Sequence, residues 1–389
     1  MNVCLVSLDY RPYRGSGLTI YAEDLARGLC ELGHRVTVVA GRRPGMPAYH
    51  EIAGAGVHRV PIGRSNWLAY CWRAARLLRC MQNEEPVDII HFLDVYFAYA
   101  YHGPFVASIW QSFRQALSAC GGRPCHTGAI DSLRRNAYYR LARAFMERPS
   151  LARAGRLIAS CTSTRHEFIE NYHVPPERID LAVQGIDTEV FRPVAAGKLR
   201  QGLGLDGCRV LLFVGFATPR KGLMYLARAL RLLPDDIRLL IVGRWAPGCR
   251  ARFLKAAGSA ADRVHELGFV ADEERPVYYS LADLYVSPSV LEGLGITPIE
   301  ALACGTPAVV TSASSGPEEV GDAGLVVPPH DPEALALGIR GLLDDDTLRT
   351  EMGRRGREHV LQHFTYQQMA SLTVRSYTRY LRTGSGETP

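Results

Sequence analysis

Residues 283–310 constrain the fold of this chain more than any other stretch, because a strand, a glycine-rich loop, a helix and a second strand follow in close succession. The apolar run Leu284–Val286 predicts a short buried strand, closed by Ser-Pro-Ser. The loop Glu292–Gly295 comes next, and Ala308–Val310 predicts another buried strand. This order is typical of an α/β fold in which parallel strands alternate with helices.

The helix inside this stretch has a start and a stop signal in the sequence. Thr297 is the predicted N-cap, with Pro298 at the first helical position and Glu300 completing a capping box. Gly305 and Pro307 end the helix. Its N-terminus then lies at the carboxyl edge of the sheet, where backbone N–H groups and the helix dipole favour a bound phosphate.

Two carboxylates flank the glycine loop, Glu292 before it and Glu300 eight residues later. A carboxylate repels phosphate, so its favoured partners are neutral hydroxyls, such as those of a sugar or a ribose. The alternative is that Glu300 only caps the helix and Glu292 is only a solvated loop acid.

The run S-P-S-x-x-E-G-L-G-x-x-x-x-E-A-L-A-C-G-T-P resembles the signature of the retaining nucleotide-sugar glycosyltransferases of family 4, the glycosyl transferases group 1. That family has the GT-B fold, two Rossmann-like domains that face each other across a cleft. The resemblance implies that Glu292 holds sugar hydroxyls and Glu300 the ribose, as an E-x7-E pair. It also implies that the donor contacts the loop and the helix start, namely Gly293, Leu294, Gly295, Ile296 and Thr297.

The N-terminal segment predicts a strand over Asn2–Ser7, a helix from about Thr19 and a strand over Arg35–Ala40. The glycine loop between the first strand and the helix is not G-x-G-x-x-G. It is similar to the family's N-terminal loop, which closes over donor phosphates and acceptor, although a plain turn is the alternative. The predicted substrate-binding residues of this loop are Gly15, Ser16 and Gly17.

One position after a predicted strand departs from the family pattern. The predicted strand 104–109 is followed by Trp110, where the family commonly carries a histidine over the reacting sugar. We assign Trp110 to substrate binding, and it stays open whether His91, Asp94 or His102 replaces the missing polar group or whether none is needed.

The second half opens on the apolar strand Arg209–Val214, followed by a loop that resembles the family's V-G-x-x-x-x-R-K-G. Arg220 and Lys221 are well placed to hold a pyrophosphate, although they are alternatively surface charges. Many family members carry an arginine after V-G, and Phe216 stands there in this chain. The resemblance implies catalytic roles for Arg220, Lys221 and Glu292, and substrate binding by Gly215, Phe269 and Val270.

The family resemblance also predicts how the chain divides into domains. Residues 1–192 are the predicted acceptor-binding Rossmann-like domain and 193–364 the predicted nucleotide-sugar-binding domain. The last amphipathic helix, 365–383, is expected to cross back to the first domain. A length of 389 residues suits two such cores.

The amino-acid composition indicates which ligands and which location are expected for this protein. The net charge of +6 is mild, and 42 of the 45 basic residues are arginine because lysine occurs only at 198, 221 and 255. This suits small anionic substrates and a GC-rich bacterial genome, and no nucleic-acid motif is present. The ten cysteines include no C-x-x-C pair, so we expect no metal site. The family resemblance implies that no cofactor is needed beyond the nucleotide-sugar substrate. Without a signal peptide or a long apolar run, a cytoplasmic location is expected.

Arginines and apolar residues share the segments 133–156 and 67–80. A basic amphipathic helix can lie on an anionic membrane, which makes peripheral membrane contact an alternative to a solvated face.

These features together predict a retaining glycosyltransferase, a hexosyltransferase. It would move a hexosyl unit from a UDP- or GDP-hexose to a hydroxyl of a small-molecule or lipid-linked acceptor. The alternatives are another GT-B enzyme, such as a pseudo-glycosyltransferase or a nucleotide-sugar epimerase, and a non-catalytic nucleotide-sugar binder. The sugar, the base, the acceptor and the oligomeric state do not follow from the sequence.

Overall fold

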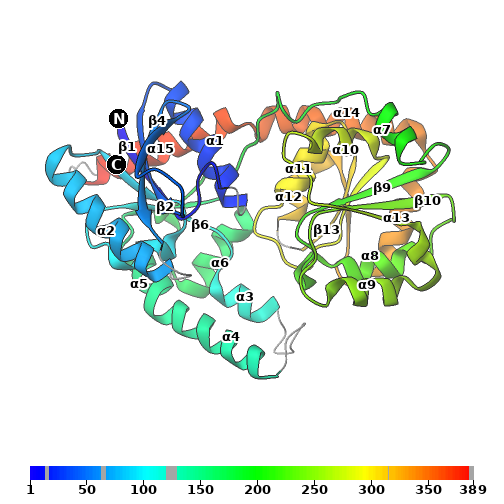
Figure 1. The fold of residues 1–389 in the computed structure, drawn as a ribbon, viewed down its shortest axis with the longest axis horizontal. Helices are drawn as coiled ribbons and strands as arrows, with labels where there is room; N and C mark the ends of the chain where they lie inside the picture. Colours follow the sequence, from blue (N-terminus) through cyan, green and yellow to red (C-terminus); the bar gives the residue numbers. More distant parts are fainter. Residues whose placement is uncertain (14–16, 63–66, 120–128, 314, 385–389) are drawn as a thin grey trace. The chain divides into compact units, whose positions relative to one another are not determined.

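The structure is a computed structural model that describes every residue except 14–16, 63–66, 120–128, 314 and 385–389. The chain forms two compact units (Figure 1). The first unit comprises residues 1–117, 134–185 and 366–389, and the second comprises 118–133 and 186–365. Each unit contains its own sheet, so the predicted α/β fold class with two Rossmann-like domains is confirmed.

An eight-stranded sheet in the order β3-β4-β2-β1-β5-β6-β7-β8 is the centre of the first unit. Its strands are β1 (Asn2–Ser7), β2 (Arg35–Arg42), β3 (Tyr49–Ile52), β4 (Ala55–Pro61), β5 (Ile89–Phe92), β6 (Val106–Ile109), β7 (Arg156–Ala159) and β8 (Ile179–Leu181). All neighbours pair in parallel except β3 and β4, which form an antiparallel hairpin. Strands β1, β5 and β6 are almost wholly buried, as expected of parallel strands covered on both faces.

Helices cover both faces of this sheet. The helices along this part of the chain are α1 (Gly17–Glu31), α2 (Trp67–Glu84), η1 (Val95–Ala100), α3 (Phe113–Ala119), α4 (Ala129–Ala142), the π-turn η2 (Arg143–Glu147), α5 (Arg148–Arg153), α6 (Thr162–Tyr172), η3 (Pro176–Arg178) and α15 (Tyr366–Gly384). The aromatic run after β5 mostly joins the core: Phe92, Phe97 and Tyr101 are buried, and Tyr96 and Tyr99 pack against them.

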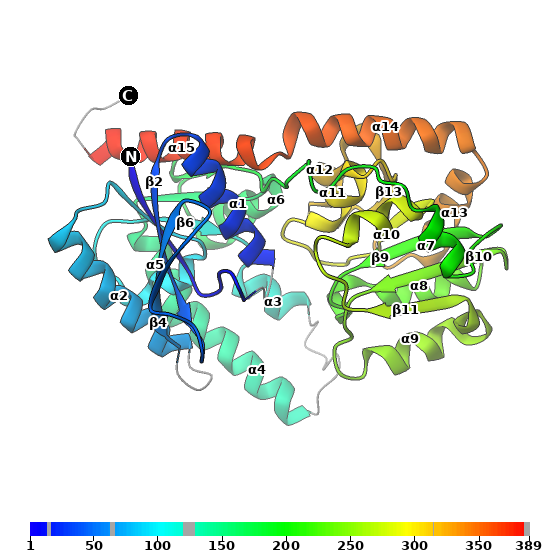
Figure 2. The ribbon, with the colours of Figure 1, turned by 45° about the horizontal axis from the view of Figure 1, so that its top comes forward.

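The C-terminal helix α15 packs on α1, although more than 330 residues separate Glu31 from Tyr366. Figure 2 shows the two helices, red and blue, side by side. The Tyr366 hydroxyl donates to the Glu31 carboxylate at 2.8 Å, and a Cβ on Gly28 would lie 2.7 Å from that of Ala370. The first and last segments of the chain therefore share one core.

The second unit is built on a six-stranded, fully parallel sheet in the order β11-β10-β9-β12-β13-β14. Its strands are β9 (Arg209–Val214), β10 (Ile237–Val242), β11 (Val264–Gly268), β12 (Leu284–Ser287), β13 (Ala308–Thr311) and β14 (Leu325–Val327). Its helices are α7 (Gly197–Gly202), η4 (Pro219–Lys221), α8 (Leu223–Leu230), α9 (Cys249–Ala257), η5 (Gly258–Arg263), α10 (Arg275–Leu281), α11 (Ile296–Ala303), α12 (Gly316–Val320), η6 (Gly321–Ala323), α13 (Pro332–Leu343) and α14 (Asp346–His363).

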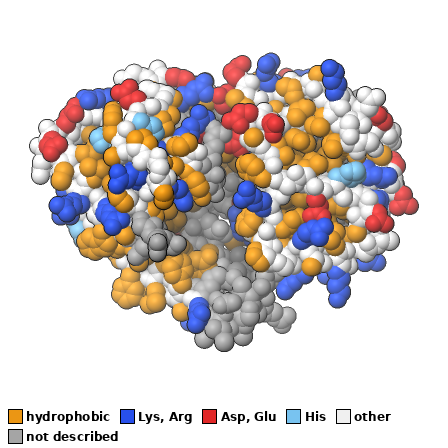
Figure 3. All heavy atoms as spheres, viewed as in Figure 1, with side chains coloured by type: hydrophobic (Ala, Val, Ile, Leu, Met, Phe, Trp, Pro, Cys, Tyr) orange, Lys and Arg blue, Asp and Glu red, His pale blue; other side chains and the backbone are white. Residues whose placement is uncertain are grey.

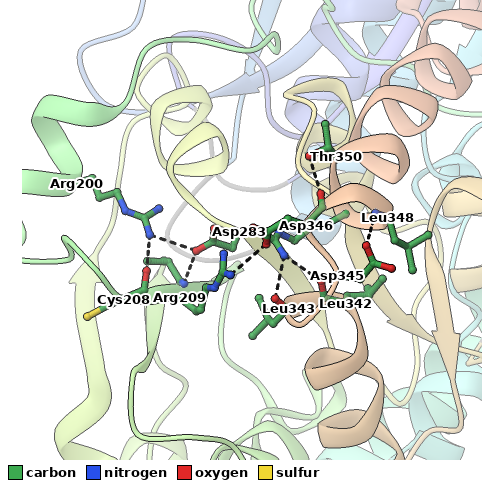
Figure 4. Close-up of polar contacts among 12 residues, drawn as sticks. Arg200, Cys208, Arg209, Asp283, Leu342, Leu343, Asp345, Asp346, Leu348 and Thr350 are labelled. Atoms are coloured by element: carbon green, nitrogen blue, oxygen red, sulfur yellow. Dashed lines mark hydrogen bonds and ion pairs between the residues drawn. The ribbon is translucent and has the colours of Figure 1, made fainter.

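A polar cluster joins the elements at the amino ends of β9 and β12 (Figure 4). The Asp283 carboxylate accepts from the Val210 amide at 2.7 Å and from the Arg200 guanidinium at 3.3 Å. On the surface nearby, Asp346 accepts from Arg209 at 3.1 Å and from Arg349 at 2.5 Å. These acids hold β9 to β12 and to α14, at the sheet edge opposite the loops that follow the strands.

We expect Asp283→Ala to lower the free energy of unfolding by about 1–3 kcal/mol, because it leaves the amide of Val210 without its side-chain acceptor and removes the charged partner of Arg200, which keeps only the carbonyl oxygens of Leu281 and Cys208. Asp346→Ala is the control, since Asp346 is exposed and its pairs are surface pairs. Urea unfolding of both variants measures the difference. Equal loss in the two variants would contradict the structural role of Asp283.

Candidate active site

The candidate site lies at the carboxyl ends of β9 and β12, which are neighbours in the sheet of the second unit. After β9 the chain runs through Gly215 and the short helix η4. After β12 it runs through the loop 288–295 into α11. Loops that leave adjacent parallel strands meet at one edge of a sheet, which is where α/β proteins bind their ligands.

Backbone contacts lock these two loops together. The amide of Val290 donates to the carbonyl oxygen of Arg220 at 2.8 Å. Gly222 has a φ of 68°, and a Cβ there would overlap the carbonyl oxygen of Pro288. Glycine is therefore required at position 222 for two reasons, the left-handed backbone and the close approach of the facing loop.

The side chains predicted to be catalytic form one ion-paired group. Arg220 Nη1 lies 2.8 Å from Glu292 Oε1, and Lys221 Nζ lies 2.5 Å from Glu292 Oε2. The Ser289 hydroxyl also donates to Oε2, at 3.3 Å. The Glu292 side chain is only 10% exposed, so its charge is desolvated and depends on these partners.

The cations determine the ionisation of Glu292. Burial would raise its pKa, but the Lys221 ammonium and then the Arg220 guanidinium outweigh burial and hold the pKa of Glu292 below its usual value. Glu292 is therefore ionised at neutral pH.

The start of α11 differs from the prediction. Gly295 is the N-cap and Ile296 the first helical residue, so the predicted capping role of Thr297 is wrong. The Thr297 hydroxyl instead accepts from the Tyr285 hydroxyl at 2.7 Å. A long-range partner from β12 thus takes the group that the local capping box would have used.

Glu319 of α12, which the sequence analysis missed, contacts the glycine loop. The amide of Gly295 donates to Oε1 of Glu319, which comes from α12, and the Ser315 hydroxyl donates to the same oxygen at 2.5 Å. The Gly295 amide is therefore taken within the protein, whereas the sequence analysis expected it to face a ligand. The adjacent pair Glu318-Glu319 gives no local signal of which acid turns inward.

Glu300 is fully buried and has specific partners. Its Oε2 accepts from the Tyr279 hydroxyl at 2.6 Å and from Arg275 at 3.0 Å. Burial raises the pKa of Glu300, and Arg275 opposes the rise. Its other oxygen, Oε1, is buried without a hydrogen bond to any described residue. Neither Arg275 nor Tyr279 was predicted, because both lie more than twenty residues before Glu300.

The remaining predicted residues of this unit lie along the same sheet edge. Gly215 directly follows β9 with a φ of 143°, and its amide donates to Val242 in the next strand at 2.9 Å. Phe269 and Val270 follow β11; Phe269 is exposed beneath the Arg244 guanidinium, and Val270 is buried.

In the first unit the predicted residues are only partly described. Gly15 and Ser16 lie outside the described residues, and Gly17 is the first residue of α1. Trp110 directly follows β6 and is half-buried. Its indole N–H donates to the Leu93 carbonyl at 2.7 Å, and its ring meets Tyr21 edge-on at 4.8 Å. Both contacts fix its orientation.

The three groups considered as replacements for the family histidine have different environments. His91 is fully buried between Ser108 and Tyr377, at 2.9 and 2.7 Å, and burial lowers its pKa to about 3, so it is a neutral core group. His102 is exposed and accepts from Arg153. Asp94 follows β5, and burial raises its pKa.

Two parallel-sheet units, with an ion-paired glycine loop on the second, define the class of the protein as GT-B. The structure of sucrose-phosphate synthase from Thermosynechococcus elongatus matches with a TM-score of 0.80, at 22% identity over 98% of this chain and 99% of that one. Anabaena HepE in complex with UDP-glucose matches with a TM-score of 0.71, at 18% identity over the full length of both chains.

Family models cover both units. The model for glycosyl transferases group 1 matches residues 197–359, and that for glycosyltransferase family 4 matches residues 15–190. A D-inositol 3-phosphate glycosyltransferase of Paenarthrobacter aurescens is 30% identical over 93% of this chain and 92% of its own. An uncharacterized glycosyltransferase of Methanocaldococcus jannaschii is 27% identical over 97% and 98%. The chain belongs to the group 1 glycosyltransferases, and the predicted family and GT-B fold are confirmed.

We expect Gly222→Ala to abolish the close approach of the two site loops and to destabilise the second unit strongly, because the new Cβ collides with a main-chain oxygen. Gly248→Ala is the matched control. Gly248 also precedes a helix, with a φ of 75°, but a Cβ there meets open space. The control should lose only the cost of the left-handed backbone, about 1–2 kcal/mol. Thermal unfolding compares the two, and equal loss would contradict the loop contact.

Proposed function

We propose that this protein is a retaining glycosyltransferase that moves a hexosyl unit from a UDP- or GDP-hexose to an acceptor hydroxyl. The observation that carries the proposal is the pairing of Arg220 and Lys221 with Glu292 beside the glycine loop. Two cations and a carboxylate are there held together at the carboxyl edge of a parallel sheet. The donor class is supported by the similarity to Anabaena HepE, whose structure is a complex with UDP-glucose.

The reaction builds negative charge on the departing phosphate as the bond between the anomeric carbon and the phosphate oxygen breaks. Fixed cations stabilise that charge more in the transition state than in the ground state. In this proposal Arg220 and Lys221 supply the positive charge. The acceptor oxygen bonds to the anomeric carbon, and its proton passes to the leaving phosphate, so no histidine is needed where Trp110 stands.

The carboxylates serve the neutral parts of the donor. Glu292, ionised and held by two cations, accepts from sugar hydroxyls. In this proposal Glu300 binds the ribose through Oε1, which is buried in the free protein and makes no hydrogen bond to a described residue, so a shift of the loop must expose it. Tyr279 and Arg275 already occupy the other oxygen and orient the group.

We expect Lys221→Ala to reduce turnover by about two to three orders of magnitude, as removal of a single preorganised donor does at other transition states. The assay is nucleotide release with UDP-glucose and GDP-mannose, after a thermal-shift screen identifies the donor. Lys255→Ala removes an exposed lysine of α9 and is the control. Turnover of Lys221→Ala close to that of the control would refute the role.

The assay also separates the alternatives. Nucleotide release without a glycoside product favours an epimerase or pseudo-glycosyltransferase. Donor binding without any turnover, across acceptors, favours a non-catalytic binder. No thermal shift with any nucleotide-sugar would leave only the fold in common with the family.

One surface of the first unit favours a lipid-linked acceptor. Along α4 and η2, Tyr138, Leu141 and Phe145 are 44%, 57% and 70% exposed, at the spacing of one helical face. Exposed arginines flank them at positions 134, 140 and 148. Figure 3 shows hydrophobic side chains along the lower left edge, where Figure 1 shows α2, α5 and one end of α4.

We propose that this face, residues 134–148, rests on an anionic lipid surface. Apolar side chains would enter the headgroup region while arginines meet lipid phosphates. No helix among the described residues has the length and hydropathy needed to span a bilayer, so this contact is peripheral.

We expect Leu141→Ser with Phe145→Ser to weaken sedimentation with phosphatidylglycerol vesicles by about tenfold or more, because two exposed apolar anchors are lost. Leu337→Ser is the control, since Leu337 is 73% exposed on α13 of the other unit. Equal binding of the double variant and wild type would refute the lipid contact. A wild-type dimer that the double variant abolishes would instead assign the face to a second copy.

A further inference from the structure

Glu319 is a buried acid of α12 that is hydrogen-bonded to the glycine loop, and no step of the proposed reaction uses it. The residue is 2% exposed. Its Oε1 accepts from the amide of Gly295 and, at 2.5 Å, from the hydroxyl of Ser315. The helix α12 thereby holds the N-cap residue of α11 in place.

The shape of the loop depends on this carboxyl. A Cβ on Gly295 would lie 2.7 Å from each carboxyl oxygen of Glu319 and 2.9 Å from its Cδ. The φ of Gly295 is −84°, a value that any residue adopts. Glycine is therefore required at position 295 by the contact with Glu319 and not by its backbone conformation.

Charges from several elements face Glu319. The Glu292 carboxylate, at the start of the same loop, repels its charged form, and the Lys221 ammonium of η4 attracts it. Tyr285 of β12 is neutral, and the charge of Glu319 contributes to raising its pKa. At the far end of α12, the His359 ring of α14 lies against Gly321. Glu319 thus belongs to the same electrostatic group as the ion pair of the site.

We propose that Glu319 is a positioning residue of the donor site: it fixes the glycine loop through the Gly295 amide and takes up a proton when the donor's diphosphate binds beside Lys221. This inference rests on the proposed function, because it assigns a diphosphate to that place. Binding adds two negative charges near a buried carboxylate and engages the cation that stabilises its charged form. The proton comes from solvent.

In the free protein, the Glu319 carboxyl can exchange a proton with solvent near neutral pH. Burial raises the pKa of Glu319 to about 7, with the charge of Glu292 adding to the rise and the Ser315 hydrogen bond opposing it. A group with this pKa is half-protonated near neutral pH. A nearby diphosphate raises the pKa further, so donor affinity falls as pH increases through 7.

The first test is calorimetry of donor binding at pH 7 in two buffers that differ in ionisation enthalpy. The probes are UDP-glucose and GDP-mannose, whose diphosphate diesters do not titrate near pH 7. Wild type should take up a substantial fraction of one proton per donor bound, and its affinity should fall by up to about tenfold from pH 6 to pH 8. Glu319→Gln keeps an acceptor for Gly295 and Ser315, so it should bind donor with no proton uptake and a flat pH profile.

The second test separates positioning from overall stability. Gly295→Ala should weaken donor binding by about tenfold or more, because the new Cβ displaces the Glu319 carboxyl and the loop. Combining it with Glu319→Ala removes the three colliding atoms and should restore part of the affinity. Strictly additive losses in the double variant would contradict the contact.

The outcomes distinguish the two proposals. If no nucleotide-sugar binds to wild type, the proposed function fails and the role of Glu319 fails with it. If donor binds with the same proton uptake and pH dependence in wild type and Glu319→Gln, the donor site stands and only the role of Glu319 is refuted.

Discussion

The candidate site depends on one buried interaction, the pairing of the Glu292 carboxylate with the cations of Lys221 and Arg220. A desolvated carboxylate is costly to keep charged unless hydrogen-bonded cations compensate. Lys221 at 2.5 Å and Arg220 at 2.8 Å provide that compensation. Because the cations follow β9 and the acid follows β12, the interaction also sets the distance between the two loops. The close packing of Gly222 on Pro288 is the steric counterpart of the same constraint.

This arrangement has a consequence for an anionic ligand. In the free protein both cations already have a carboxylate partner, so a diphosphate must share them with Glu292. The Glu292 carboxylate would then keep part of its contact with the cations and accept hydrogen bonds from neutral hydroxyls as well. Under the proposed function, the site would therefore favour a ligand that carries an anion and a polyol side by side, as a nucleotide-sugar does, over phosphate alone.

The sequence was sufficient where the signal is local and strong. The strands Asn2–Ser7 and Arg209–Val214 were predicted at the residues where they occur, because short apolar runs between glycines and polar turns have few alternatives. The hairpin of β3 and β4 was missed, because only four of its eleven strand residues are buried and its apolar run is interrupted. Its turn, Ala53-Gly54, has positive φ at both residues, and an alanine at the first position hides the usual signal.

The site was less predictable than the sheet, because long-range partners override local preferences. The sequence from Thr297 to Glu300 matches a capping box. In the structure, however, the Thr297 hydroxyl accepts a hydrogen bond from Tyr285, and the Glu300 carboxylate accepts from Tyr279 and Arg275. The inward turn of Glu319 likewise depends on Ser315 and Gly295, and the neighbouring Glu318 has the same local chemistry. Residue types and spacing identify candidates, whereas their partners come from the fold.

Glu292 of the glycine loop and Glu319 of α12, which contacts that loop, illustrate how the fold assigns different chemistry to the same side chain. Glu292 and Glu319 are both desolvated, and the charge of Glu292 acts on Glu319. Two cations contact Glu292 directly and lower its pKa, whereas an amide and a hydroxyl contact Glu319, whose pKa rises to about 7. A pair of carboxyls pushed apart in this way gives a site one permanent anion and one group that exchanges a proton near neutral pH. In the proposed function, Glu319 would balance the added charge of a bound diphosphate by taking up a proton, while Glu292 would keep the charge that orients the sugar.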